Sequence, residues 1–169
     1  MNMTNTINPA VAATIVTQEQ LLEHWQGHRR LTRRMIEAFP EDKLFTFSIG
    51  GMRPFSELVM EFIDMAEPGI IGVQTGVWKK FGETSKPAKP QTKQELLEHW
   101  DELTAFINET WQKISPERFQ ETDLAFGQWE GPIHWIIFYW IDNEIHHRGQ
   151  GYVYLRALGI EPPAFWDRR

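Results

Sequence analysis

The chain has 169 residues, which is enough for one domain with a sizeable hydrophobic core and leaves little room for a second. Hydrophobic residues make up 41 % of the chain and its formal net charge is −6. This is the composition of a globular protein with an acidic surface, which argues against tight binding to nucleic-acid phosphates. The absence of cysteine excludes disulfides, thiolate metal ligands and cysteine nucleophiles, and it is compatible with a cytoplasmic location.

The N-terminal part of the chain predicts a tail followed by a long helix. Residues 1–16 carry neither the basic region nor the apolar core of a signal peptide, and we expect them to form a tail. Thr17 and Gln20 have the spacing of a capping box, which predicts the start of the first helix. The apolar stripe of this helix is interrupted near its middle by His28 and Thr32.

A second helix is expected to begin at Pro54, because proline is favoured in the first turn of a helix. Its apolar stripe is interrupted by Glu61, again near the middle. Pro68 is expected to kink or end the helix, since proline removes a backbone donor. Glycines follow from Gly69 onward at a spacing that would allow close approach to a neighbouring helix, and residues 86–90 read as a linker.

The second half of the chain predicts two more helices. Thr92 and Glu95 form another capping box at the start of the third. Residues 120–130 are expected to be an irregular connection. The fourth helix should begin at Pro132 and run to Leu158, with a glycine after it as the C-cap. No apolar block is long enough to span a membrane.

These elements predict an all-α fold, a four-helix bundle in one domain that covers residues 17–163, with a C-terminal tail over residues 164–169. The only strand-like segment lies near residues 45–49.

A polar run interrupts the fourth helix between two apolar blocks. Asn143, His147 and Gln150 fall on one stripe with apolar residues, and this stripe is expected to face the interior. Asp142 and His146 form a second stripe with the same spacing, and spacing alone does not choose between the two.

Two further groups of charges have a simpler interpretation. Glu144 and Arg148 are four residues apart, which predicts an ion pair on the helix surface. The arginines of the first helix, between Arg29 and Arg34, are expected to form a solvated face rather than a phosphate site, because the whole chain is acidic.

Mid-helix polar positions meet at the same height in a bundle of similar helices, and buried polar groups need partners or a ligand. We therefore expect a metal or small-molecule pocket between the first, second and fourth helices. Two alternatives stay open: His28 is a hydrogen-bonded core residue, and Glu61 turns outward. The residues expected at this pocket are Glu61, Asn143 and His147 at its centre, with His28, Gln150, Trp25 and Trp140 around them.

The run from His146 to Gln150, with residues 152–163 that follow it, resembles the end of the DinB-like (DinB/YfiT-like) superfamily. The start of the second helix, residues 55–61, resembles the same superfamily. The resemblance implies a four-helix bundle of up-up-down-down topology that forms a homodimer. It also implies a divalent metal held by one histidine of the second helix and two of the fourth. Some members are metal-dependent transferases that join a low-molecular-weight thiol, such as bacillithiol or mycothiol, to an electrophile.

Carried over to this chain, the three metal-ligand positions of the family are Glu61, Asn143 and His147. One carboxylate, one amide and one imidazole favour manganese or magnesium over zinc or nickel. The resemblance therefore implies a metal-dependent thiol transferase or hydrolase, with one divalent metal ion and a small-molecule thiol or electrophile as partner; the catalytic residues stay unknown. The alternative is a non-catalytic dimeric binding or structural bundle that has lost the metal. Neither hypothesis involves nucleic acid or a membrane.

Overall fold

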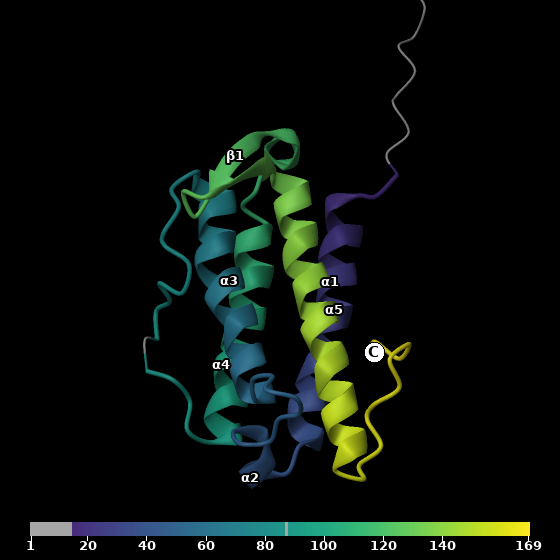
Figure 1. Ribbon diagram of the computed structural model, residues 1–169. Helices are drawn as coiled ribbons and strands as arrows, with labels where there is room; N and C mark the ends of the chain where they lie inside the picture. Colours follow the sequence, from purple (N-terminus) through teal and green to yellow (C-terminus); the bar gives the residue numbers. More distant parts are fainter. Residues whose placement is uncertain (1–14, 87) are drawn as a thin grey trace, which may run out of the picture.

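The computed structural model describes residues 15–86 and 88–169. Four long helices pack side by side, with a small β-hairpin across one end of the bundle (Figure 1). The all-α fold is therefore confirmed. The elements in chain order are α1 (Gln18–Ala38), α2 (Glu41–Leu44), α3 (Phe55–Thr75), α4 (Lys93–Trp111), the 3₁₀ helix η1 (Pro116–Gln120), β1 (Thr122–Ala125), β2 (Trp129–Pro132) and α5 (Ile133–Ala157).

Contacts between the helix ends give the direction of each helix. The side chain of Gln18, at the start of α1, donates to the carbonyl of Trp111 at the end of α4. Lys93, at the start of α4, donates to the carbonyl of Phe39 just after α1. The helices α1 and α4 are therefore antiparallel, and each of α1 and α3 packs against both α4 and α5.

The remaining contacts correct the expected up-up-down-down topology. Gly151 of α5 lies against Phe55 at the start of α3, and Trp140 lies against Gly69 near its end, so α3 and α5 are antiparallel. Trp140 also packs on Trp25, and Thr32 bonds to a later turn of α5, so α1 and α5 run parallel. The order is up-down-down-up, because the connection from α3 to α4 runs back along the bundle (Figure 1).

Local capping sets the starts of α1 and α4 as expected. Thr17 and Gln20 bond reciprocally at the start of α1, and Thr92 and Glu95 do so at the start of α4. The C-cap of α3 is Gly76, whose φ of 71° is left-handed and favours glycine.

Pro68 was expected to end or kink α3. It does not end the helix, which continues to Thr75. Proline deprives the carbonyl four residues earlier of its helical partner. That carbonyl belongs to Asp64, and it accepts a hydrogen bond of 3.0 Å from the backbone N–H of Gly82 in the following connection. A residue distant in sequence thus replaces the bond that Pro68 cannot make.

The expectation about the connection before the last helix is also wrong. The expected irregular connection at 120–130 contains an antiparallel hairpin, in which Ala125 pairs with Trp129. Its turn depends on Phe126 and Gly127, both with positive φ (54° and 71°). The strand-like segment at 45–49 follows the short helix α2 as turn and coil.

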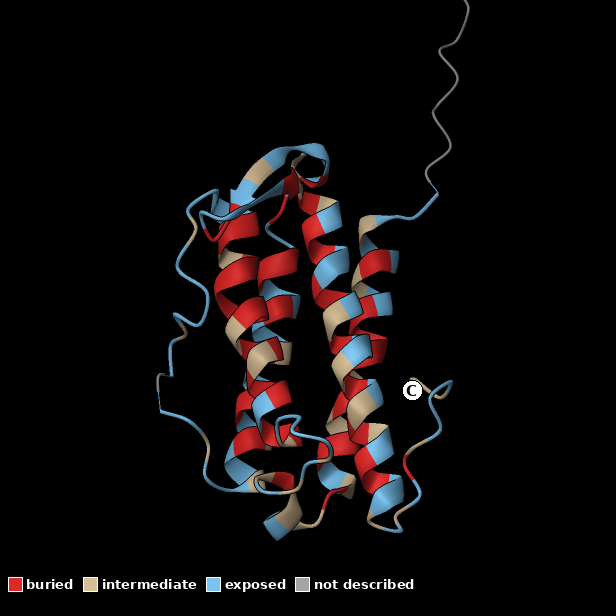
Figure 2. Cartoon of the chain, in the orientation of Figure 1, coloured by how far each residue is buried: buried red, intermediate tan, exposed pale blue. Residues whose placement is uncertain are grey.

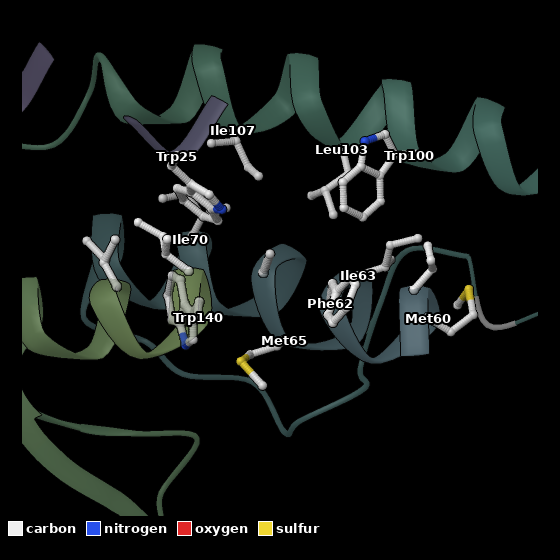
Figure 3. Close-up of a cluster of buried hydrophobic side chains, with 14 of the residues drawn as sticks. Trp25, Met60, Phe62, Ile63, Met65, Ile70, Trp100, Leu103, Ile107 and Trp140 are labelled. Atoms are coloured by element: carbon white, nitrogen blue, oxygen red, sulfur yellow. The ribbon is translucent and has the colours of Figure 1, made fainter. Parts of the chain in front are cut away.

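Large apolar side chains fill the space between the four helices, and the buried residues of each helix face its neighbours while the exposed residues face outward (Figure 2). In Figure 3, Trp25 and Ile107 face Ile70 and Trp140 across the bundle. The close approach of α3 and α5 depends on Gly69, where a Cβ atom would lie 2.6 Å from Trp140 Cζ2. None of the described helices combines the length and the hydropathy that crossing a membrane requires.

Candidate functional site

The three residues predicted for the centre of the site lie together between α3 and α5. Asn143 Nδ2 donates to Glu61 Oε1 at 3.1 Å, and His147 Nε2 lies 3.3 Å from the same oxygen. Their spacing of four residues places both side chains on the face of α5 that packs on α3. The rival stripe, with Asp142 and His146, is exposed. The stripe that faces the interior is therefore the one with Asn143 and His147.

Arg53, which the sequence analysis missed, completes this cluster. Its Nη2 lies 2.5 Å from Glu61 Oε2, and its carbonyl accepts a hydrogen bond of 3.1 Å from the hydroxyl of Tyr154 on α5. Burial raises the pKa of Glu61, but the bonds from Arg53 and Asn143 outweigh burial and hold this pKa below its ordinary value. Glu61 is therefore ionised at neutral pH.

Glu61 lies where two cavities meet. One cavity has a volume of about 310 Å³ and apolar walls, with Trp135, Tyr139 and Trp140 of α5 on one side and Phe126 of the hairpin turn on the other. The second has a volume of about 380 Å³, and its charged lining includes Arg53, Asp64 and Lys89. Glu61 and Phe81 line both. The site is thus an aromatic pocket with a carboxylate at its edge, next to a charged pocket.

The donor atoms at Glu61 do not fit a resident metal ion well. Among the described residues, no group of three or more His, Asp or Glu side chains is placed to hold one. His147 Nδ1 is buried without a partner in the described structure, whereas a metal-bound imidazole normally donates its second N–H to an acceptor. Arg53 already supplies the positive charge next to Glu61. Glu61, Asn143 and His147 therefore fit a cluster of side chains bonded directly to one another better than they fit a set of metal ligands.

The residues expected around the centre lie in three different places. Trp140 lines the aromatic cavity, and Trp25 packs behind it at 5.9 Å between ring centroids. Gln150 lies beside His146 on the helix surface, at 3.5 Å. His28 Nδ1 lies 2.8 Å from Arg148 Nη2, at the contact between α1 and α5. His28 is buried and hydrogen-bonded, and it does not line either cavity at Glu61. The expected pocket between three helices is corrected, because the aromatic cavity at Glu61 lies between α3, α5 and the hairpin.

Glu144 and Arg148 do pair, at 3.5 Å, but the expectation of a surface pair is wrong. Their exposed fractions are 1 % and 5 %, because this face of α5 packs against α1. Thr32 donates to Glu144, and Arg148 donates to the carbonyl of His28 at 3.2 Å. Burial raises the pKa of Glu144 despite the nearby Arg29, Arg148 and Thr32, which act to lower it.

The expected solvated arginine face of α1 is also corrected. Arg29 is buried, with its guanidinium stacked 3.8 Å above the ring of Trp100. Arg30 Nε donates to the carbonyl of Arg168 at 2.7 Å, and Arg34 bonds to Asp167. Arg30 and Arg34 therefore hold the C-terminal tail against α1.

Comparisons with known proteins agree with this architecture. The sequence pattern of the DinB family matches residues 2–168. A DinB-like protein from Bacillus cereus ATCC 10987 is similar in structure, with a TM-score of 0.69 and 17 % identity over 88 % of this chain and 97 % of its own. A DinB-like protein from Bacillus subtilis is also similar in structure, with a TM-score of 0.69. It is 18 % identical in sequence, and the match covers 89 % of this chain and 99 % of its own. No curated protein shows significant similarity to the chain. The family match covers nearly the whole bundle, and the chain therefore belongs to the DinB family.

Proposed function

We propose that this DinB-family protein binds a small, flat organic molecule in the aromatic cavity, with a hydrogen-bond donor of that molecule directed at Glu61. The observation that carries this proposal is an ionised carboxylate at the edge of a cavity of about 310 Å³ whose other walls are apolar. Ligand pockets commonly combine apolar walls with a few polar groups that orient the ligand.

The chemistry of the walls selects the ligand class. Trp135 and Tyr139 are each 54 % exposed, which is high for rings of this size, and both line the cavity. Aromatic walls favour flat ligands that stack against them. A carboxylate accepts hydrogen bonds and donates none, so an amine or alcohol suits Glu61 and a ligand carboxylate does not.

The proposal is tested with three probes that share a phenyl ring and a two-carbon chain but differ in their polar end. These are phenethylamine, 2-phenylethanol and phenylacetate, with binding followed by ligand-observed NMR. We expect the first two to bind, and Trp135→Ala and Tyr139→Ala to weaken them at least about fivefold, because each change removes one aromatic wall. Any binding of phenylacetate should be unaffected by the same two changes, because a carboxylate does not suit Glu61. Phe106→Ala is the matched control, since this exposed ring lies on α4. Equal binding by all variants would refute the proposal.

A divalent metal ion at Glu61 Oε1, His147 Nε2 and the amide of Asn143 is the second candidate. Its support is that Asn143 Oδ1 is buried without a partner in the described structure, and that Glu61 and His147 offer donor atoms 3.3 Å apart. On this hypothesis the protein is a metal-dependent transferase or hydrolase that acts on a thiol or an electrophile. Elemental analysis of protein purified without a chelating tag, together with His147→Ala, tests it. Protein that takes up no divalent ion would exclude this candidate.

A further inference from the structure

A separate cavity of about 630 Å³ lies on the opposite side of α5 from Glu61, between this helix and the C-terminal tail. Arg148, Tyr152 and Arg156 of α5 line it, together with His28 of α1 and Arg168 of the tail. Phe165 and Trp166 add an apolar wall. The cavity shares none of these residues with the two cavities at Glu61.

The contact between His28 and Arg148 determines the tautomer of the buried imidazole. A guanidinium donates hydrogen bonds and accepts none, so Nδ1 of His28, 2.8 Å from Arg148 Nη2, must be the acceptor. Burial, with the charges of Arg148 and Arg168 and the nearby His24, lowers the pKa of His28 to about 3. The ring is therefore neutral, and its proton is on Nε2.

This N–H group is a buried donor for which the described residues offer no acceptor. His28 is 2 % exposed, and its Nε2 atom has no partner among the described residues. The hydroxyl of Tyr152, which lines the same cavity, is also buried and without a partner there. Unpaired buried donors are costly, and two in one cavity favour a ligand that supplies the acceptor.

The charges around the cavity favour a negative ligand. In the buried cluster behind it, Arg29 and Arg148 both lie near Glu144, and Asp101 also acts on Arg29. At the cavity itself, Arg156 and Arg168 face one carboxylate among the described lining residues, that of Glu161. Guanidinium groups therefore outnumber carboxylates among the described residues that line the cavity, and such a surplus of positive charge favours an anion.

We propose that this cavity binds an organic anion, a carboxylate or phosphate group attached to an apolar body. The anion accepts hydrogen bonds from His28 Nε2 and Tyr152 and is neutralised by Arg156 and Arg168. Its apolar body lies against the rings of the tail. The tail is held in place by Arg30 and Arg34, and by Gly27, where a Cβ atom would approach Arg168 Cβ to 3.3 Å.

The test is calorimetric titration of the full chain with phenyl phosphate and phenylacetate. The neutral 2-phenylethanol serves as the reference, because its binding should not depend on the arginines of this cavity. We expect Arg156→Gln, Arg168→Gln and Tyr152→Phe each to weaken the preferred anion about tenfold, because each removes one charge or hydrogen bond to it. These side chains are at least partly exposed, so the variants should fold. Tighter binding of phenyl phosphate assigns the site to phosphate esters, and tighter binding of phenylacetate assigns it to carboxylates.

Two variants control for other causes. Lys113→Gln removes an exposed positive charge from the turn that follows α4 and should leave anion binding unchanged. Trp135→Ala alters the cavity at Glu61 and should also leave it unchanged. Failure of both anions to bind, or an equal loss in Lys113→Gln, would overturn the proposal. Loss in Trp135→Ala alone would place the anion at the other cavity and would overturn it as well.

Discussion

Arg53 binds one carboxylate oxygen of Glu61 at 2.5 Å, while the other oxygen faces Asn143 and His147. The guanidinium thus occupies a position where a bound cation would otherwise balance the carboxylate. Arg53 is about half exposed, with 46 % of its side chain accessible, so this contact can be removed without opening the core.

Replacing Arg53 by Met should raise the pKa of Glu61, because the bond that lowers it most is lost while burial remains. It should also strengthen binding of Mn²⁺, since the competing positive charge is gone. Mn²⁺ binding followed by electron paramagnetic resonance checks this, and we expect at least about a fivefold gain in affinity over the unaltered protein. Arg156→Met is the control for the loss of one positive charge elsewhere. Identical Mn²⁺ affinities in all three proteins would contradict the competition between Arg53 and a metal.

Replacing Glu144 by Ala should cost about 3–5 kcal/mol of unfolding free energy, because it leaves Arg148 buried without its carboxylate. Urea denaturation measures the loss. The matched control is Glu109→Ala, which breaks an exposed pair between α4 and Lys113 in the turn after it and should cost less than about 1 kcal/mol. Similar losses in the two variants would show that the buried cluster contributes no more than a surface pair.

His28 predicts a pH dependence of stability. Its folded pKa of about 3 lies below the ordinary value of 6.5, so the unfolded chain binds the proton more tightly. The contribution of the neutral ring is fully present above pH 6.5 and is lost as the pH falls toward 3, with a slope of at most about 1.4 kcal/mol per pH unit. Denaturation between pH 7 and pH 4 should show a shallower slope for His28→Gln than for the unaltered protein. The exposed His146→Gln should keep the original slope, and a slope unchanged in His28→Gln would contradict the assignment.

Two helical glycines should respond in opposite directions to alanine. At Gly69 the added methyl group meets Trp140 at 2.6 Å, so Gly69→Ala should cost about 1–3 kcal/mol and displace a wall of the aromatic cavity. At Gly149 no atom of the described residues lies within 4 Å of the added methyl group, so Gly149→Ala should stabilise by about 0.5–1 kcal/mol through helix propensity. Urea denaturation of the pair checks both signs. Stabilisation by Gly69→Ala would mean that α3 and α5 are less tightly packed than described.

Features set by short-range geometry could be predicted from the sequence. The capping boxes depend on residues three apart, and the meeting of Glu61 with Asn143 and His147 follows from helical spacing and mid-helix position. The continuation of α3 through Pro68 could not be predicted, because it depends on the distant N–H of Gly82. Arg53 was missed for a similar reason, since its position depends on a loop conformation that residue spacing does not determine.

The burial of Glu144 and Arg148 was missed because α5 packs against two helices. Asn143 and His147 face α3, while the residues next to them in sequence face α1. A single inward stripe is a poor description of such a helix, and the adjacent polar positions belong to two separate clusters.

The proposed ligand cavity is tested most directly by the indole N–H signals of the eight tryptophans during titration with 2-phenylethanol. Trp129, Trp135 and Trp140 line the cavity at Glu61, whereas Trp166 lines the cavity under the tail and Trp100 is buried beside Arg29. Binding at Glu61 predicts saturable shifts for the first three signals, with those of Trp100 and Trp166 unmoved. Shifts confined to Trp166, or no saturable shift at all, would contradict the account.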